Sequence, residues 1–221
     1  MNNPKIVVIE DDVQAYFECM NSKADYSFTS LRKWFPCPDG AFVKSKKEMH
    51  IKLSVTSLWS QDKLAGNLLK NYSNMLDDSI ALELISKGEK LLDQEYISQC
   101  NEVSSIIFSN LEIREIAEKR KVNAYYLHHR LIDLGVEHLY SEKAIPFFVP
   151  IYVNGREKLR KLFFANRIYT PVHWPKASAK LNGENELYSQ ELSLICDQRY
   201  DIDDMENQIK ILKQFLDSED E

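Results

Sequence analysis

A run of aliphatic residues near the start of the chain limits the folds that this sequence can adopt. The segment Lys5–Glu10 contains four consecutive β-branched residues and is followed by Asp11 and Asp12. An aliphatic run without polar alternation predicts a strand buried on both faces, which is typical of parallel sheets. Carboxylates at the carboxyl end of such a strand lie where open α/β sheets bind ligands. We therefore expect an α/β fold with polar groups at one sheet edge.

The composition excludes several classes of protein. The 221 residues carry 28 Lys and Arg against 34 Asp and Glu, a net charge of −6, which does not favour binding to nucleic acid. No apolar run reaches the roughly 18 residues that span a bilayer, and no secretory signal is present. The four cysteines form no CxxC pair. These features predict a reduced, cytoplasmic protein without a membrane partner.

The first half of the chain contains signals for strands and then for helices. The aromatic-rich segment Asp25–Val43, with its prolines and an Asp-Gly pair, predicts short strands joined by a tight turn rather than a helix. Apolar residues from Ser60 to about Gln99 recur at helical spacing, with a break expected at Gly88.

The second half predicts a compact α+β unit. Ser109–Glu112 fits a capping box for a helix that runs to about Leu134 and stops at Gly135. Further predicted elements follow in order: a strand at Ile145–Val153, a helix capped near Asn154, a strand at Ile168–Pro175, a loop to about Leu187, a strand at Leu192–Cys196, and a helix capped by Asp201.

Lys33 is a candidate reactive amine. It lies among the apolar residues Leu31, Trp34 and Phe35, and partial desolvation makes an amine a usable nucleophile toward a carbonyl. A lysine that forms a Schiff base and an aspartate that holds a pyridinium nitrogen are the two groups that pyridoxal phosphate needs most. A solvated surface lysine and a turn-forming aspartate remain the alternative interpretation of these residues alone.

Four segments in order resemble a known family. Ile9–Gln14 resembles the IED segment of the DegT/DnrJ/EryC1/StrS aminotransferases, which act on sugar nucleotides and use pyridoxal phosphate. Ser30–Ala41 is similar to the lysine segment of one branch of that family. Ile116–Leu127 resembles the family's helix with an Arg and an Asn, and the segments Ile168–Pro175 and Ser193–Glu206 resemble its C-terminal strand and final helix.

The resemblance implies roles for individual residues. Lys33 matches the Schiff-base lysine, Asp11 the partner of the pyridine nitrogen, and Gln14 the position near the phenolic oxygen of the cofactor. Ser30 matches a position near the phosphate. Lys33 would then also move the proton during transfer of an amino group from a small-molecule donor to a keto-sugar acceptor.

The chain departs from the family in two places. Asp12 and Val13 replace common alanines, and a second carboxylate beside Asp11 disfavours charging both. Because adjacent strand residues face opposite ways, we expect Asp12 to point to solvent. Only Met1–Lys5 precede the strand, where family members carry most of the large-domain sheet and a phosphate-binding turn.

The resemblance therefore implies a C-terminal portion of a type I fold. We expect a remnant of the large parallel-sheet domain at 1–58, connecting helices at 59–108, and a small α+β domain at 109–221. Two hypotheses follow: an aminotransferase, completed as a homo-oligomer such as a dimer or by a separate N-terminal polypeptide, or a truncated non-catalytic fragment or interaction subunit.

Two further residues are candidates for substrate contact, and the remaining histidines do not predict a metal site. His173 could contact substrate, but a hydrogen-bonded core histidine explains it as well. Arg199 could pair with an anionic substrate or brace the last helix through Asp201 or Asp203. The adjacent His128 and His129 face different directions on a helix, and His138 has no cysteine or carboxylate cluster around it, so no metal site is predicted.

Overall fold

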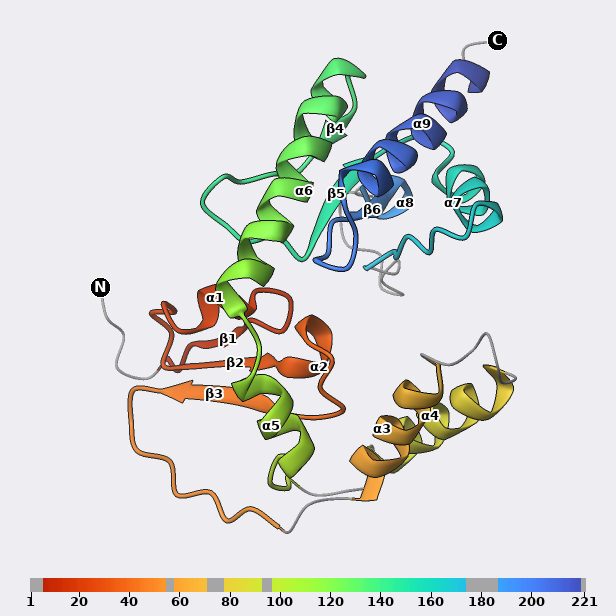
Figure 1. Cartoon of the computed structure of the whole chain (residues 1–221). Helices are drawn as coiled ribbons and strands as arrows, with labels where there is room; N and C mark the ends of the chain where they lie inside the picture. Colours follow the sequence, from red (N-terminus) through yellow and green to blue (C-terminus); the bar gives the residue numbers. More distant parts are fainter. Residues whose placement is uncertain (1–5, 55–57, 71–77, 93–96, 174–186, 220–221) are drawn as a thin grey trace. The chain divides into compact units, whose positions relative to one another are not determined.

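The computed structural model describes residues 6–54, 58–70, 78–92, 97–173 and 187–219 (Figure 1). The chain divides into two compact units, Met1–Leu111 and Glu112–Glu221, and each is described by itself. Each unit contains one three-stranded sheet, so the fold is a mixed α/β fold with two small sheets. Among the described residues, no helix is long and apolar enough to cross a membrane.

The sheet of the first unit has the order β1-β2-β3. Strand β1 (Ile9–Asp11) pairs in parallel with β2 (Tyr26–Ser30), and β2 pairs antiparallel with β3 (Ala41–Ser45). Helix α1 (Tyr16–Cys19) lies between β1 and β2 in the chain, and helix α2 (Leu31–Trp34) follows β2 directly. The parallel pairing of the first strand and the strands within 25–45 are confirmed, although one helical turn stands between the latter two.

The prediction that the first strand is buried is wrong. Strand β1 begins only at Ile9, and Ile6, Val7 and Val8 before it are, like Ile9 itself, between 51% and 65% exposed. Among the described strands only β2 pairs with β1, so β1 is an edge strand. The composition of the run suits a strand covered on both faces, and the described residues leave it uncovered.

The core of the first unit is aromatic. Tyr16, Phe35 and Phe108 meet edge to face, with ring centroids 4.8–6.3 Å apart. Phe108 belongs to helix α5 (Glu102–Ser109), and Asn101 caps this helix by accepting a hydrogen bond from the Val103 N–H. These contacts join α1, the end of α2 and α5 into one core.

The turn after α2 is tied to the start of α5. The Asp39 carboxylate accepts the Asn101 N–H at 3.0–3.2 Å, and the Asp39 N–H donates to the Ser104 hydroxyl at 3.3 Å. Gly40 has a φ of +101°, and a Cβ there would lie 2.8 Å from Cδ1 of Leu31. The Asp-Gly pair therefore makes a turn that only glycine fits without strain.

Helices α3 (Leu58–Lys70) and α4 (Asp78–Leu92) pack closely against each other. The predicted break at Gly88 is wrong, because Gly88 lies inside α4. A Cβ on Gly88 would lie 2.5 Å from Cγ of Lys63 and 2.8 Å from the carbonyl oxygen of Trp59. The glycine allows the two helices to approach closely rather than ending one of them.

The second unit is built around the antiparallel sheet β4-β5-β6. Its strands and helices are α6 (Ile113–Asp133), β4 (Glu137–His138), β5 (Phe148–Tyr152), α7 (Arg156–Ala165), α8 (Leu187–Gln190), β6 (Glu191–Ile195) and α9 (Ile202–Glu219). Helix α6 contacts β4, β5 and α9, and α7 contacts β6 and α9 (Figure 1). The buried core includes Leu127, Leu131, Ile151, Phe163, Leu194, Met205 and Leu212.

Most predicted elements of this unit are confirmed, and three details are wrong. Ser109 ends α5 and donates to the Ser105 carbonyl, so it does not cap α6, which begins at Ile113 with no side-chain cap. Gly155, in the left-handed region, precedes α7 in place of a cap by Asn154. Residues 168–173 form no strand, and 174–186 lie outside the described residues.

Two helix-end predictions are confirmed. The α6 helix stops before Gly135, which has a φ of +66°. The Asp201 carboxylate accepts the N–H groups of Asp203 and Asp204 at 3.0 and 3.3 Å and so begins α9.

Candidate functional site

The helical turn α2 presents Lys33 on a rigid support. Leu31 and Trp34 are buried on either side of it. The Leu31 N–H donates to the Gly40 carbonyl at 3.0 Å, and the Trp34 indole donates to the Val13 carbonyl at 3.0 Å. The Lys33 side chain is exposed, so the expectation that its apolar neighbours desolvate it is wrong. Those neighbours point into the core and hold the turn, while Lys33 projects away from them.

The segment after β1 lies against this turn. Because β1 and β2 are parallel neighbours, their carboxyl ends lie at the same edge of the sheet. Asp11 ends β1, and Ser30 ends β2 immediately before α2. The indole bond from Trp34 to Val13 joins the segment that carries Asp11 and Gln14 to the turn that carries Lys33. The structure thus brings these two motif segments to one edge.

The carboxylates after β1 face opposite ways, but not as expected. Asp11 is exposed, and its Oδ1 accepts the Val13 N–H at 3.0 Å. Asp12 is only 4% exposed, and its Oδ2 has no hydrogen-bond partner. Asp12 continues the pairing with β2 through its N–H to the Phe28 carbonyl at 2.8 Å, which directs its side chain to the buried face. The expectation that Asp12 points to solvent is therefore wrong.

The environment of Asp12 is unfavourable for a charged group. Burial raises the pKa of Asp12, and the nearby Glu10 and Asp11 carboxylates raise it further. The Cys19 thiol and the Lys44 ammonium lower it without reversing the shift. The Asp11 carboxylate is therefore the one at this strand end that is free to meet a ligand.

A charged cluster that the sequence did not indicate lies beside Lys33. The Arg32 Nη1 donates to Oε1 of Glu89 in α4 at 3.0 Å, and the Lys63 ammonium of α3 bonds the same oxygen. The Arg32 guanidinium also lies 5.6 Å from the Trp59 ring centroid. Arg32, the residue immediately before Lys33, is therefore held against helices α3 and α4.

Burial and the neighbouring charges act in opposite directions on the pKa values of this cluster. Burial lowers the pKa of Lys63, against the opposing effect of its bond to Glu89. Burial acts to raise the pKa of Glu89, but the Lys63 ammonium and the Arg32 guanidinium lower it overall. Lys63 is 26 residues from Glu89 in the sequence, and the packing of α3 against α4 brings the two side chains together.

In the second unit, His173 is held by hydrogen bonds. Its Nδ1 lies 3.0 Å from the Ser193 hydroxyl, which donates to the Glu191 carboxylate at 2.8 Å. Glu191 also accepts the His173 backbone N–H at 3.2 Å. Phe148 packs against the imidazole at 4.7 Å between centroids. The hydrogen-bonded interpretation of His173 accounts for these contacts.

Arg199 does not brace α9. Its guanidinium bonds the Asp197 carboxylate, with Nε 3.1 Å from Oδ1, and the side chain is exposed. The expected partners Asp201 and Asp203 instead take part in the α9 cap. Arg199 is therefore attached to its own turn, with its guanidinium open to solvent.

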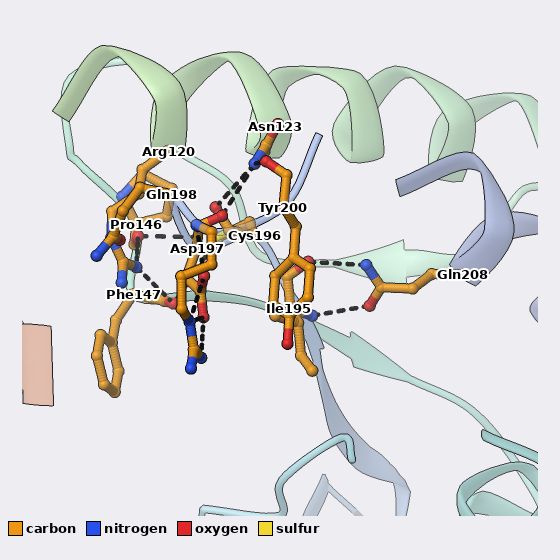
Figure 2. Close-up of polar contacts among 11 residues, drawn as sticks. Arg120, Asn123, Pro146, Phe147, Ile195, Cys196, Asp197, Gln198, Tyr200 and Gln208 are labelled. Atoms are coloured by element: carbon orange, nitrogen blue, oxygen red, sulfur yellow. Dashed lines mark hydrogen bonds and ion pairs between the residues drawn. The ribbon is translucent and has the colours of Figure 1, made fainter. Parts of the chain in front are cut away.

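The Arg and Asn of α6 hold the connections around the sheet (Figure 2). Arg120, only 2% exposed, donates to the Gln198 side chain at 2.7 Å and to the carbonyls of Pro146 and Phe147 at 3.3 and 3.2 Å. The Asn123 amide donates to the carbonyls of Asp197 and Tyr200 at 3.1 and 3.0 Å. These two side chains satisfy buried backbone groups, so they build the unit rather than a binding surface.

No metal-binding group of three or more His, Cys, Asp and Glu residues occurs in the described part of the chain. The fold resembles part of the fold of solved aminotransferase structures. No family model and no curated protein matches the chain by sequence.

Three solved aminotransferase structures illustrate the structural similarity to this chain. The sugar aminotransferase CalS13 from Micromonospora echinospora is 16% identical with a TM-score of 0.60, and the match covers 94% of this chain and 58% of that one. The putative sugar aminotransferase Spr1654 from Streptococcus pneumoniae, in its PLP form, is 15% identical with a TM-score of 0.57, covering 95% and 57%. A DegT DnrJ EryC1 StrS aminotransferase from Brucella abortus is 16% identical with a TM-score of 0.50, covering 94% and 56%.

The resemblance drawn from the motifs is confirmed for the fold. The chain spans just over half the length of the aminotransferase structures it matches. It is therefore similar to a portion of these proteins.

Proposed function

We propose that this chain is the C-terminal portion of a pyridoxal-phosphate-dependent aminotransferase, with Lys33 as the Schiff-base lysine. The observation that carries the proposal is the meeting of two motif segments at one sheet edge, joined by the Trp34–Val13 hydrogen bond. An amine and a carboxylate at that edge suit an aldehyde and a pyridine nitrogen. The first sheet is then the remnant of a large domain and the second unit the small domain.

Four residues of this chain would bind the cofactor, and one of them would also transfer a proton. When bound, pyridoxal phosphate supplies an electron sink. Lys33 would hold the cofactor, yield to the amino donor, and carry the proton between carbon atoms during the transfer. Asp11 would keep the ring nitrogen protonated, while Gln14 and Ser30 would orient the phenolic oxygen and the phosphate. The acceptor would be a keto-sugar nucleotide or a related carbohydrate precursor, since two of the matched structures are described as sugar aminotransferases.

The proposal requires further polypeptide at β1. The exposed aliphatic residues before Glu10 and the single pairing of β1 are what an interior strand shows when its neighbours are absent. The match leaves 100 − 56 = 44% of the Brucella abortus structure and 100 − 58 = 42% of CalS13 outside the similarity. We propose that a separate N-terminal polypeptide covers this edge and completes the phosphate site, or that a second copy of this chain in a homo-oligomer covers it.

A second candidate is a non-catalytic fragment or interaction subunit. The observation that favours it is the exposure of Lys33 and Asp11, because a working site excludes water from its reacting groups. In this case the exposed β1 edge would serve association alone.

A pyridoxal phosphate titration of the purified chain separates the two candidates. We expect the visible absorption of the bound cofactor to saturate at one equivalent, and borohydride followed by peptide mapping to label Lys33. Lys33→Met should abolish this label, and Lys47→Met, which removes another exposed lysine of the first unit, should leave it intact. Label spread over many lysines, or no saturation, would contradict cofactor binding by this chain alone and favour the second candidate.

A further inference from the structure

Two histidines of the second unit, one on a helix and one on a strand, lie within hydrogen-bonding distance of each other. Nδ1 of His128, on α6, lies 2.7 Å from Nε2 of His138, on β4. The two residues are separated by the tight turn at Gly135, in which the Val136 N–H donates to the Leu131 carbonyl at 3.0 Å. The pair therefore rests on a short, hydrogen-bonded connection rather than on a long loop.

The second ring nitrogen of His138 determines its tautomer. Nδ1 of His138 lies 2.8 Å from the Val136 carbonyl oxygen, which can only accept a hydrogen bond. The hydrogen of a neutral His138 ring is therefore on Nδ1, and Nε2 presents a lone pair to His128. A backbone carbonyl that holds the far nitrogen in this way is the usual outer contact of a metal-binding histidine.

The His128 ring is also oriented by its surroundings. It stacks on Tyr140, with centroids 4.2 Å apart and planes at 20°. Burial lowers the pKa of His128, and His138 and His129 lower it further, while the Glu142 carboxylate opposes them without reversing the shift. The His129 ring lies edge-on, with its centroid 5.3 Å from that of His128. Both His128 and His138 are half-buried, so solvent can reach the space beside them.

We propose that His128 and His138 form a two-histidine binding site for Zn²⁺ or a similar divalent transition metal. Imidazole nitrogens bind zinc at about 2.0–2.1 Å, so two such ligands lie about 2.9–3.4 Å apart for coordination angles of 90–110°. The rings need to separate by only a few tenths of an ångström from their present distance. Water completes the coordination, with the Glu142 charge offsetting part of the charge of the ion.

Metal binding replaces the hydrogen bond between the rings. Without the ion, Nδ1 of His128 donates its hydrogen to Nε2 of His138. With the ion, that hydrogen moves to Nε2 of the same His128 ring, so both rings stay neutral and each donates one lone pair. No oxidation and no net proton release from the pair takes place in this exchange.

The site escapes prediction from the sequence for a simple reason. His128 and His129 are adjacent and diverge, and the partner of His128 is ten residues further on, beyond the helix end. Only the reversal of the chain at Gly135 brings the two rings together.

A zinc titration followed by NMR of the imidazole C–H signals tests the proposal. The experiment uses the full chain with Cys100→Ser, because that thiol is exposed and binds zinc by itself. We expect the His128 and His138 signals to shift together with 1:1 stoichiometry, while the His129 signals move little. The same measurement needs no substitution at the histidines, so it does not depend on the folding of a variant.

Variants then assign the ligands. His128→Gln and His138→Gln should each weaken zinc binding at least tenfold in a competition assay with a chromogenic chelator. The matched control His129→Gln, on the same helix, should bind zinc as the parent does. Absence of binding, or binding that survives both ligand substitutions, would overturn the proposal and leave the pair as a hydrogen bond between two rings.

Discussion

Replacement of the buried Asp12 by asparagine should stabilise the first unit at neutral pH. The side chain is 4% exposed and its Oδ2 has no partner, so its charge is incompletely compensated. An unsatisfied buried polar group costs about 1–3 kcal/mol, and more when charged. Asparagine keeps the shape and removes the charge, but its amide nitrogen inherits the unpartnered position. We therefore expect Asp12→Asn to gain about 1–2 kcal/mol, the lower part of that range.

The gain should depend on pH in one direction. The pKa of Asp12 in the folded state is raised by burial above its ordinary value of 3.8. The folded protein thus holds this proton more tightly than the unfolded chain does, and the associated stability is present below pH 3.8 and is lost as the pH rises through the folded-state pKa. The advantage of Asp12→Asn should accordingly be full at pH 7 and shrink as the pH approaches 4.

Urea unfolding followed by tryptophan fluorescence measures the effect. Trp34 is buried and donates to the carbonyl of Val13, the residue after Asp12, so its emission reports this region. The matched control is Asp11→Asn, which makes the same change of charge at an exposed neighbour and should shift stability by no more than about 0.5 kcal/mol. A gain that persists unchanged at pH 4, or a loss of stability at pH 7, would refute the reasoning.

Three further substitutions test the packing of the two units. Gly88→Ala should destabilise the α3–α4 pair by about 1–3 kcal/mol, because its Cβ meets Lys63; unchanged thermal unfolding would contradict the close approach. Asp201→Ala should cost about 1 kcal/mol through loss of the α9 cap, measured by urea unfolding with Asp217→Ala, near the other end of that helix, as the control. Arg120→Met should cost about 2–3 kcal/mol, because it removes a buried donor from the partly buried Pro146 and Phe147 carbonyls; a smaller loss in calorimetry would show that water replaces the guanidinium.

The sequence predicts the second unit better than the first for a physical reason. In the second unit, the apolar faces of the helices pack against other elements of the same unit. The residues that the helical spacing predicts to be buried are buried, including Leu127 and Leu131 of α6 and Met205 and Leu212 of α9. In the first unit the aliphatic run at Ile6–Ile9 has no cover among the described residues. The aliphatic pattern of this run predicts burial, and the part of the chain that the structure describes leaves the run exposed.

The motif segments show which part of a site a pattern can specify. The resemblance of the segments at Asp11 and Lys33 to one family implies that they meet, and a hydrogen bond from the Trp34 indole to the Val13 backbone carbonyl joins them. The sequence does not show which side chain points into the core. Asp11 and Asp12 point in opposite directions, as expected for adjacent strand residues, but Asp12 is the buried one. A period of two gives opposite faces and leaves open which of them the core covers.

The contrast between rigid support and exposed side chains bears on the proposed function. The turn that carries Lys33 is held by the buried Leu31 and Trp34 and by the Arg32–Glu89 ion pair, contacts that all come from within the first unit. The geometry of the lysine turn therefore does not depend on the polypeptide that we propose at β1, whereas the exclusion of water from Lys33 does. On this argument, covering the β1 edge should change the affinity for pyridoxal phosphate more than it changes which lysine is labelled.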